Sequence, residues 1–592
     1  MRIGDYSFLS DCQSAALVSR RGSVDWFCVP RFDSPPVFSG LLDPHAGHWH
    51  IRPRGGFSQS RSYLKDTLVV ENVFETGSGS VKVTDALALH AEKRGHEIGE
   101  GAPHVLLRMV EGVSGHVDME MEFRPRFEYG LTLPWLQEQE GGVSALGGPV
   151  RLDLTASVPI WIVGETAGAG FTVKAGETAW FGLAYAETYA GTAPARVRVA
   201  DSLKHTVAAW RSWAGLHEVY QGLHEQEVRT GALVLQGLTY QPSGAIVAAA
   251  TTSLPEVMGG EANWDYRYAW LRDISLMMSA LWVAACPDEP DRFFEWISHT
   301  GVGRSDAVQI MFGVEGERDL SERQLDNLVG FAGSRPVRVG NQAWRQRQLD
   351  VFGEVIYAAY LLRERLSPME EMVRKLLIGL AERASRQWQL PDAGMWEARD
   401  RMRHYTSSKV MCWTGLDCAI KMSAMLRVGK AQKDRWRRAR DRIKKAVLKQ
   451  AWNSELGAFA GAFGSDRLDA SVLQMPLMGF LPASDERMQS TIRLISQELY
   501  SNGVVRRWQE EENGFIACNY WLVECLAMVG ELDGARELFE TTTALSNDLG
   551  LMSEEADAAT GELLGNFPQA FAHVGLINAS WRLTQLEERG AD

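Results

Sequence analysis

The sequence predicts a multidomain β + α protein, in which an antiparallel β-sandwich is followed by a larger helical domain. At 592 residues the chain is longer than a single compact core usually grows. Up to about residue 200, short runs alternate polar and apolar residues. Beyond that point, apolar residues recur at steps of three and four, the spacing of helices that bury one face.

The alternating runs are typical of half-buried antiparallel strands. The clearest is "VDMEMEFR" (117–124), in which every second residue is apolar. Three further segments have the same pattern: 81–89, 171–176 and 195–200. We expect the glycine-rich stretches 75–80 and 111–115 to separate strands. Residues 1–199 are therefore predicted to form a sandwich of many strands.

A linking helix is predicted over residues 200–220, and residues 221–592 are almost wholly helical in pattern. Twelve helices are expected, near residues 222–240, 265–285, 289–302, 347–366, 367–389, 406–427, 429–453, 468–479, 485–500, 516–530, 531–546 and 567–587. Twelve helices joined by loops of unequal length fit a double ring of six inner and six outer helices. The periodicity itself does not require that closure.

Composition excludes several classes of protein. The densest basic stretch, 430–449, carries apolar residues at helical spacing, so it is interpreted as a solvated helix face and nucleic acid is not expected as a partner. The N-terminus lacks a signal-peptide pattern, and no run of about 18 apolar residues occurs, so a soluble cytoplasmic protein without a membrane partner is expected. Seven cysteines without C-x-x-C spacing argue against a disulfide framework; Cys412 and Cys418 have the pattern of small core residues.

Two loops combine groups that suit a sugar site. "NWDYRYAWLRD" (263–273) offers aromatic rings such as Tyr268 and Trp270 for the apolar face of a pyranose, and Arg272 with Asp273 for its hydroxyls. The alternative is a structural aromatic corner with an internal salt bridge. "PDAGMWEARD" (391–400) is the second.

In that second loop Glu397 follows Trp396. A carboxyl beside an indole can be partly desolvated, which raises its pKa and allows it to act as an acid. The alternative is a surface helix cap. Two later loops, "VVRRWQEEENGF" (504–515) and the segment around Glu554 and Glu555, supply further carboxylates.

Inverting hydrolysis of a glycosidic bond needs one protonated carboxyl and one ionised carboxylate on opposite faces of the sugar. Two glutamates on separate loops can supply that pair. Chemistry alone does not pair Glu397 with Glu554 rather than with Glu510, Glu511 or Glu555, and solvation is the alternative for each.

A resemblance to a known family rests on five motifs, which follow one another along the chain: "GSVDWFCVPRFDSPPVFSGLLDP" (22–44), "NWDYRYAWLRD", "MWEARD", "SKVMCWTGLDCAI" (408–420) and "SEEADAATGELLGNFPQAFAHVGLINA" (553–579). Together they resemble the glucoamylase-like glycoside hydrolases of family 15, within them the bacterial trehalase and glucoamylase branch. The resemblance implies an N-terminal antiparallel β-super-sandwich, a linking helix and an (α/α)6-barrel catalytic domain.

The resemblance also implies roles for residues. Glu397 falls on the general acid of the family and Glu554 on its general base, with Glu555 a neighbour. Arg272 and Asp273 match the pair that binds the non-reducing glucose, and Trp396 a wall of that subsite. Arg507 and Trp508 match the Arg–aromatic pair that flanks the subsite, although Arg506 occupies a place that is often aromatic. The segment 348–355 is expected on an inner helix near the pocket.

One departure bears on the substrate. The residue after the acid, often acidic in starch-degrading relatives, is here Ala398, followed by Arg399. A small α-glucoside, trehalose first, is therefore expected, with maltooligosaccharides or isomaltosaccharides as the alternative. Two further hypotheses for the function are a glycoside phosphorylase and a non-catalytic sugar-binding protein. The chemistry requires no metal or cofactor, and no metal-ligand cluster with recognisable spacing is expected.

Overall fold

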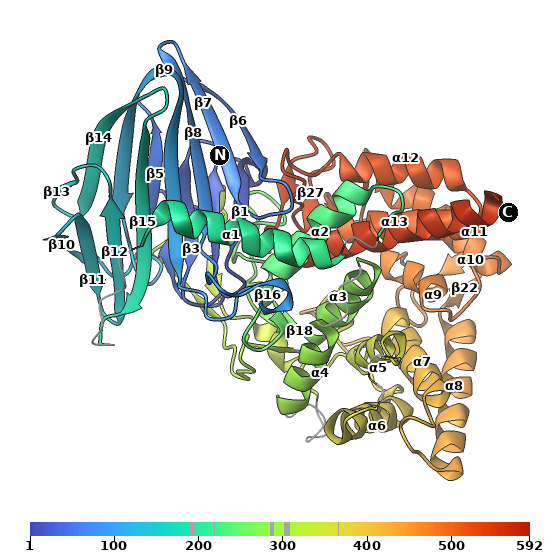
Figure 1. Cartoon of the computed structure of the whole chain (residues 1–592). Helices are drawn as coiled ribbons and strands as arrows, with labels where there is room; N and C mark the ends of the chain where they lie inside the picture. Colours follow the sequence, from blue (N-terminus) through green and yellow to red (C-terminus); the bar gives the residue numbers. More distant parts are fainter. Residues whose placement is uncertain are drawn as a thin grey trace.

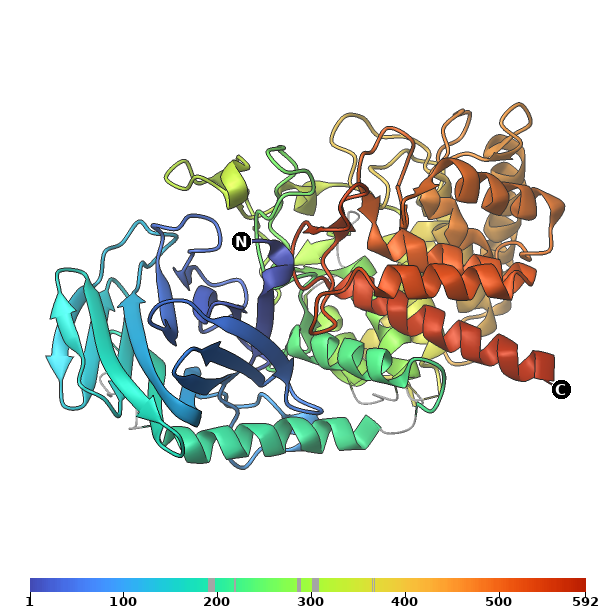
Figure 2. The ribbon, with the colours of Figure 1, turned by 90° about the horizontal axis from the view of Figure 1, so that it is seen from above.

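The computed structural model describes the chain apart from residues 190–196, 218–219, 285–288, 301–307, 365, 367 and 592. A domain of strands lies beside a domain of helices, and α1 (Val199–Ala214) runs from one to the other (Figure 1). The N-terminus lies at the join between the domains, whereas the C-terminus is at the far end of the helical domain (Figure 2). The predicted β + α architecture is therefore present.

The first domain is built on a 15-stranded antiparallel sheet. Its strands are β1 (Tyr6–Ser10), β2 (Ala15–Ser19), β3 (Ser23–Cys28), β4 (Pro36–Phe38), β5 (His48–Pro53), β6 (Ser58–Tyr63), β7 (Val70–Thr76), β8 (Gly79–Leu87), β9 (Val105–Arg124), β10 (Trp135–Gln139), β11 (Gly142–Gly147), β12 (Val150–Ala156), β13 (Trp161–Val163), β14 (Thr166–Lys174) and β15 (Thr178–Glu187). The first half of β9 pairs with β8 and β15, and the second half with β14 and β5. This long strand thus joins the two layers of the sandwich.

The alternation predicted over 117–124 is confirmed, because every second residue of this part of β9 is buried. The break predicted over 111–115 is wrong, since these residues continue the strand. A Cβ at Gly112 would lie 2.0 Å from the carbonyl oxygen of Lys174, and one at Gly115 2.1 Å from that of Ser78. The glycines there admit a close neighbouring backbone rather than a turn.

Most of the other strand predictions hold. Residues 81–87 lie in β8 and 171–174 in β14, and the stretch 75–80 contains the turn between β7 and β8. The strand predicted over 195–200 is wrong where it is described: α1 begins at Val199, and residues 195–196 lie outside the described residues. Val199 is buried against β15. This packing favours the helix, although the short alternating pattern predicts a strand.

The second domain contains the helices α2 (Glu225–Gly237), α3 (Leu271–Val283), α4 (Glu289–His299), α5 (Val351–Leu361), α6 (Glu371–Gln387), α7 (Thr406–Lys421), α8 (Lys430–Gln450), α9 (Gln474–Leu477), α10 (Glu486–Glu498), α11 (Ile516–Val529), α12 (Leu532–Thr543) and α13 (Ala570–Ala591). Each of the twelve predicted segments coincides with one of them, although α13 continues four residues beyond the predicted end at 587. The predicted start at residue 265 is wrong, because β18 (Ala269–Trp270) pairs with β19 (Met311–Phe312) before α3 begins.

The helices form an (α/α)6 barrel. Contacts run around an inner ring from α3 to α5, α7, α9, α11 and α13, and α13 returns to α3. The other six helices pack outside: α2 on α13, α4 on α3 and α6, α6 on α5, α8 on α7, α10 and α12 on α11. The inner helices α7 and α11 are buried on nearly all sides, whereas α8 and α10 bury one face.

Short ladders fold the loops between the helices. They are β16 (Thr239–Tyr240) with β17 (Ala245–Ile246), β20 (Arg323–Gln324) with β21 (Arg338–Val339), β22 (Trp452–Asn453) with β23 (Ala458–Phe459), β24 (Tyr500–Ser501) with β25 (Val504–Val505), and β26 (Gly514–Phe515) with β27 (Glu555–Ala556) and β28 (Leu563–Leu564). The ladder β26–β27–β28 brings the loop before α11 beside the loop before α13.

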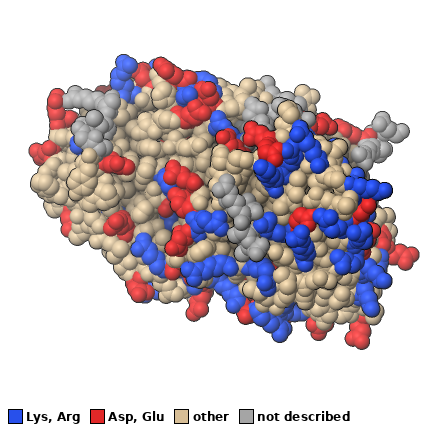
Figure 3. All heavy atoms as spheres, turned by 90° about the horizontal axis from the view of Figure 1, so that it is seen from below, with Lys and Arg blue, Asp and Glu red and all other residues tan. Residues whose placement is uncertain are grey.

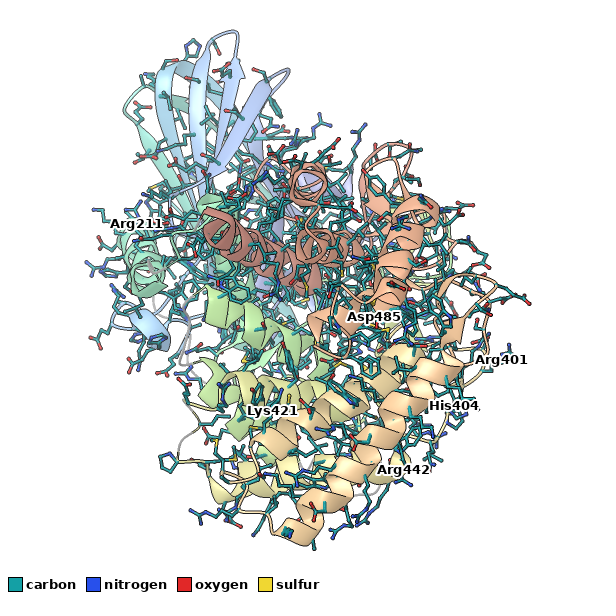
Figure 4. All side chains as sticks on the ribbon, turned by 90° about the vertical axis from the view of Figure 1, so that its right-hand side faces the viewer. Arg211, Arg401, His404, Lys421, Arg442 and Asp485 are labelled. Atoms are coloured by element: carbon teal, nitrogen blue, oxygen red, sulfur yellow. The ribbon has the colours of Figure 1, made fainter. Side chains whose placement is uncertain are left out.

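The basic stretch 430–449 forms α8, a helix with one buried face, as predicted. Arg442 is exposed on the outer face of this helix (Figure 4). On the face seen in Figure 3, Lys and Arg side chains gather over the helical domain and are interspersed with Asp and Glu. Among the described residues, no helix is long and apolar enough to cross a membrane. The six described cysteines are buried and unpaired.

The β-domain supports the loop that precedes α3. Arg267 is fully buried, pairs with Asp265 at 2.7 Å and donates to the carbonyl oxygen of Ser34 at 3.0 Å and to the Tyr129 hydroxyl at 2.6 Å. The salt bridge predicted as the structural alternative for 263–273 is thus present between Asp265 and Arg267. A second pair within this motif, Arg272 with Asp273 at 2.9 Å, lies at the start of α3.

Candidate active site

A cavity of about 310 Å³ lies at the end of the barrel where the inner helices begin. Its walls come from the loops that lead into α3, α7, α11 and α13, together with the stretch around residue 256. The lining residues with aromatic or ionisable side chains are Glu256, Trp264, Tyr266, Trp270, Arg272, Asp273, Trp396, Glu397, Arg399, Arg507, Trp508, Phe515, Glu554 and Phe571. Aromatic and charged side chains thus surround one small space, as in a site for a polar ligand with apolar faces.

Glu397 enters this cavity from the loop before α7. Its backbone has φ of 59°, a left-handed conformation that is uncommon for a residue other than glycine and often found at functional sites. Its Oε1 accepts hydrogen bonds from the indole Nε1 of Trp270 at 2.7 Å and from Nε2 of Gln348 at 3.3 Å. The carboxyl is therefore held in one orientation by groups from two other loops.

Glu554 enters from the loop before α13 and is buried. Its Oε1 accepts from the Tyr266 hydroxyl at 2.7 Å, while its buried Oε2 has no hydrogen-bond partner among the described residues. A Cβ on Gly565 would lie 2.9 Å from that Oε2, so glycine leaves the atom room. Burial, followed by the nearby charge of Glu256, raises the pKa of Glu554 well above its ordinary value.

Arg507 lies among carboxylates behind Glu554. It donates to Glu511 at 2.6 Å, to Glu256 at 2.8 Å and to Glu555 at 2.8 Å. Glu555 is therefore committed to an ion pair, whereas Glu554 beside it has a free oxygen. Because one guanidinium faces so many carboxylates in a buried place, it also fixes the loops that carry them.

The floor and one wall complete the cavity. Arg272 donates to Asp273 at 2.9 Å and to the carbonyl oxygen of Met395 at 2.6 Å, and burial raises the pKa of Asp273. Trp396 donates its indole proton to Asp469 at 2.9 Å and packs edge-on against Phe515 at 5.2 Å between centroids. The ring is thus fixed at a wall rather than against Glu397, whose indole partner is Trp270.

The structure brings eight of the nine predicted site residues to this cavity: Arg272, Asp273, Trp270, Trp396, Glu397, Arg507, Trp508 and Glu554. Tyr268 is not among the lining residues; it is buried in a small apolar cluster with Trp270, Ile310 and Met311. Glu510, one of the alternatives for the second carboxylate, is exposed and pairs with Arg467 at 2.5 Å. Gln348, from the segment 348–355, reaches the cavity through its hydrogen bond to Glu397.

Six lining residues with aromatic or ionisable side chains were not predicted as site residues: Glu256, Trp264, Tyr266, Arg399, Phe515 and Phe571. Tyr266 and Trp264 lie inside the motif 263–273, so the aromatic composition of that motif could have identified them. Arg399 lies over the ring of Trp264, 3.6 Å from its centroid, and only the fold reveals that stack. Glu256 lies outside every motif identified in the sequence, so no pattern indicates that it is a site residue.

Residues 223–581 match the model of a family described as Glycosyl hydrolases family 15. The chain belongs to this family. Residues 1–178 match a second model, described as Trehalase-like, N-terminal. The predicted resemblance is thus confirmed, and this family 15 chain is a glycoside hydrolase.

The similarity to relatives covers nearly the whole of this chain. A trehalase from Mycolicibacterium smegmatis is 37% identical, with 99% of this chain and 92% of the relative covered, and a trehalase from Thermoplasma volcanium is 30% identical, with 99% and 94% covered. A solved bacterial glucoamylase complexed with acarbose has the same fold, with a TM-score of 0.77 at 11% identity over 98% of this chain and 94% of that one. This chain thus combines the fold of the family with the cavity described above.

Proposed function

We propose that this family 15 hydrolase is an inverting, exo-acting α-glucosidase whose substrate is trehalose. The observation that carries the mechanism is that Glu397 and Glu554, from separate loops, line one cavity. Inversion needs such a pair, one carboxyl to protonate the leaving oxygen and one carboxylate to activate water. The step requires no metal or organic cofactor.

In the proposed complex one glucose occupies the inner part of the cavity. Arg272 and Asp273 bind its hydroxyls, and Trp396, held by Asp469, lies against its apolar face. Arg507 and Trp508 close the other side. These contacts hold the anomeric carbon between the two carboxyl groups, which converts the attack of water into a positioned event.

Glu397 then donates its proton to the glycosidic oxygen as that bond breaks. Glu554, ionised, takes a proton from the water that attacks the anomeric carbon from the opposite face. The free Oε2 of Glu554 is the atom for this proton, because its Oε1 already accepts from Tyr266. The products are the departing alcohol and glucose with an inverted anomeric centre.

The full-length similarity to proteins named trehalase supports trehalose as the substrate. A cavity of about 310 Å³, at the lower end for small-molecule sites, also suits a short substrate. We assign the second glucose to the outer part, beside Arg399 and Trp264. The cytoplasmic location remains a prediction from the sequence.

A substrate comparison tests the assignment. Full-length enzyme is given trehalose, maltose and isomaltose at equal concentrations, in buffers with and without phosphate, and glucose release is measured. Trehalose is expected to be hydrolysed at least about tenfold faster than the others. A preference for maltose or isomaltose would favour the glucoamylase-type or glucodextranase-type alternative, and glucose 1-phosphate formed only with phosphate would show a phosphorylase.

Removing the charge of Glu256 is expected to change the pH dependence of catalysis. Glu554 works ionised, so its raised pKa places the acidic limb of kcat/KM above the ordinary value for glutamate, about 4.3. Glu256→Gln removes a neighbouring negative charge, which lowers the pKa of Glu554 and moves that limb down by about 1 pH unit. A pH profile of kcat/KM checks this; an unchanged or higher limb would contradict it.

Replacing Arg399 tests the place of the second glucose. Arg399→Ala removes the guanidinium over Trp264 and is expected to raise KM for trehalose about tenfold. Hydrolysis of α-glucosyl fluoride, which has no second sugar, should change little. Arg401→Ala, an exposed residue of the same loop, is the control (Figure 4). Equal losses on both substrates would place Arg399 elsewhere in the reaction.

A further inference from the structure

The β-domain carries a cluster of side chains that neither the fold nor the proposed reaction uses. Strands β5 and β9 run antiparallel, with His50 directly opposite Glu122. His48 and His50 are two residues apart and therefore lie on the same face of the sheet. On β5 that face is the more exposed one, while the intervening Trp49 is buried.

The ligand atoms of His48, His50 and Glu122 all lie within 4.8 Å of one another. Nε2 of His48 is 2.9 Å from Oε1 of Glu122, and the two imidazole rings are parallel within 5°, with centroids 5.5 Å apart. The side chains are 19%, 13% and 39% exposed, respectively, so all three remain accessible to a small ion. Rigid paired strands, rather than loops, hold them in this arrangement.

The three residues line a second cavity, of about 620 Å³. None of its lining residues lines the candidate active site. Its other walls include Asp25 of β3 and the turn 330–332 from the helical domain. The carboxylate of Asp25 accepts from the hydroxyls of Tyr6 at 2.9 Å and Ser23 at 2.5 Å. The cluster therefore faces a cavity that lies between the two domains.

The neighbouring cations are largely neutralised. Arg52 pairs with Glu120 at 2.8 Å, and the buried Arg108 pairs with Asp85 at 2.8 Å. Arg21 also lines the cavity, but it is exposed to solvent, which screens its charge. A bound cation would thus meet a local excess of acceptor groups.

We propose that His48, His50 and Glu122 form a binding site for a divalent transition-metal ion of the Zn²⁺ class. Two imidazoles and one carboxylate are a ligand set suited to Zn²⁺, whereas Ca²⁺ and Mg²⁺ prefer oxygen ligands alone. Ligand atoms around a tetrahedral Zn²⁺ lie about 3.3 Å apart, given bonds of about 2.0–2.2 Å. Small side-chain rotations would bring the present atoms to that spacing.

Three protein ligands would leave a fourth position on such an ion open to water. The ion would join β5 to β9, the strand shared by both layers of the sandwich. The sequence pattern predicts no metal-ligand cluster, and the structure differs from it here. The H-x-H pair was visible in the sequence, but its third member is 74 residues from His48 and only strand pairing brings it close.

Metal titration of the full-length protein tests the site. After removal of metal with a chelator, Co²⁺ is added and its visible absorption recorded, and Zn²⁺ binding is measured by calorimetry. The wild-type protein is expected to bind one ion at this site with the spectrum of tetrahedral Co²⁺. Glu122→Gln, which keeps the shape of the side chain, and His50→Ala should each weaken binding at least about tenfold.

His116→Ala is the matched control, because His116 is an exposed histidine on the same strand β9 and outside the cluster. Zn²⁺ should raise the melting temperature of the wild type and of this control, but not of His50→Ala. Equal affinity and spectrum in the wild type, Glu122→Gln and His50→Ala would overturn the proposal and leave a hydrogen-bonded ladder. Trehalose hydrolysis is a separate readout, so failure here leaves the proposed function intact.

Discussion

Glu554→Gln is expected to lower kcat for trehalose by about 10³-fold or more, within the range for loss of a positioned general base. The amide keeps the size of the side chain and a place for the Tyr266 hydroxyl, but cannot take a proton from water. Binding should survive because the glucose contacts are made by other residues. Steady-state kinetics, with calorimetric binding of trehalose to the variant, checks both parts.

Glu555→Gln is the matched control for that experiment. Glu555 is the adjacent carboxylate, equally buried, but it pairs with Arg507 at 2.8 Å. Its replacement loosens Arg507 and should cost far less than the loss of Glu554. A variant Glu554→Gln with most of the wild-type activity, or a greater loss in Glu555→Gln, would reverse the assignment of the doublet.

Glu397→Gln is expected to lower kcat for trehalose by about 10²–10⁴-fold, because the departing glucose then leaves without a proton. Hydrolysis of α-glucosyl fluoride should be affected much less, since fluoride leaves with little need for an acid. Glu554→Gln should lose activity on both substrates, because each reaction needs an activated water. This contrast separates the two roles with the same pair of substrates.

The exposed Glu510 supplies the control for Glu397. It pairs with Arg467 on the surface, so Glu510→Gln should retain wild-type kinetics on trehalose and on the fluoride. If Glu397→Gln lost both activities equally, Glu397 would not be acting as the acid of the leaving group.

The sequence predicted the elements of this fold well where a periodic pattern coincides with burial. The inner and outer helices were found from apolar steps, and the strand 117–124 from its alternation. Where short segments were ambiguous, tertiary contacts decided. Gly112 and Gly115 continue β9 because adjacent backbones approach them, and Val199 starts α1 because it packs on the sheet.

The candidate site divides in the same way. Residues in compact motifs, such as Arg272, Trp396 and Glu397, were predicted and reach the cavity. Glu256 was not, because its partner Arg507 is 251 residues away and only the fold makes them neighbours. Tyr268 shares the motif of Arg272 yet is buried elsewhere, since composition does not say which ring faces the cavity.

The configuration of the first glucose released from trehalose tests the central claim most directly. Proton NMR during the first turnovers, faster than mutarotation, resolves the two anomers. Attack of water on the opposite face inverts one glucose to the β anomer, while the departing glucose keeps its α configuration. Equal initial amounts of α- and β-glucose are therefore expected. Release of α-glucose alone would show retention and contradict the roles given to Glu397 and Glu554.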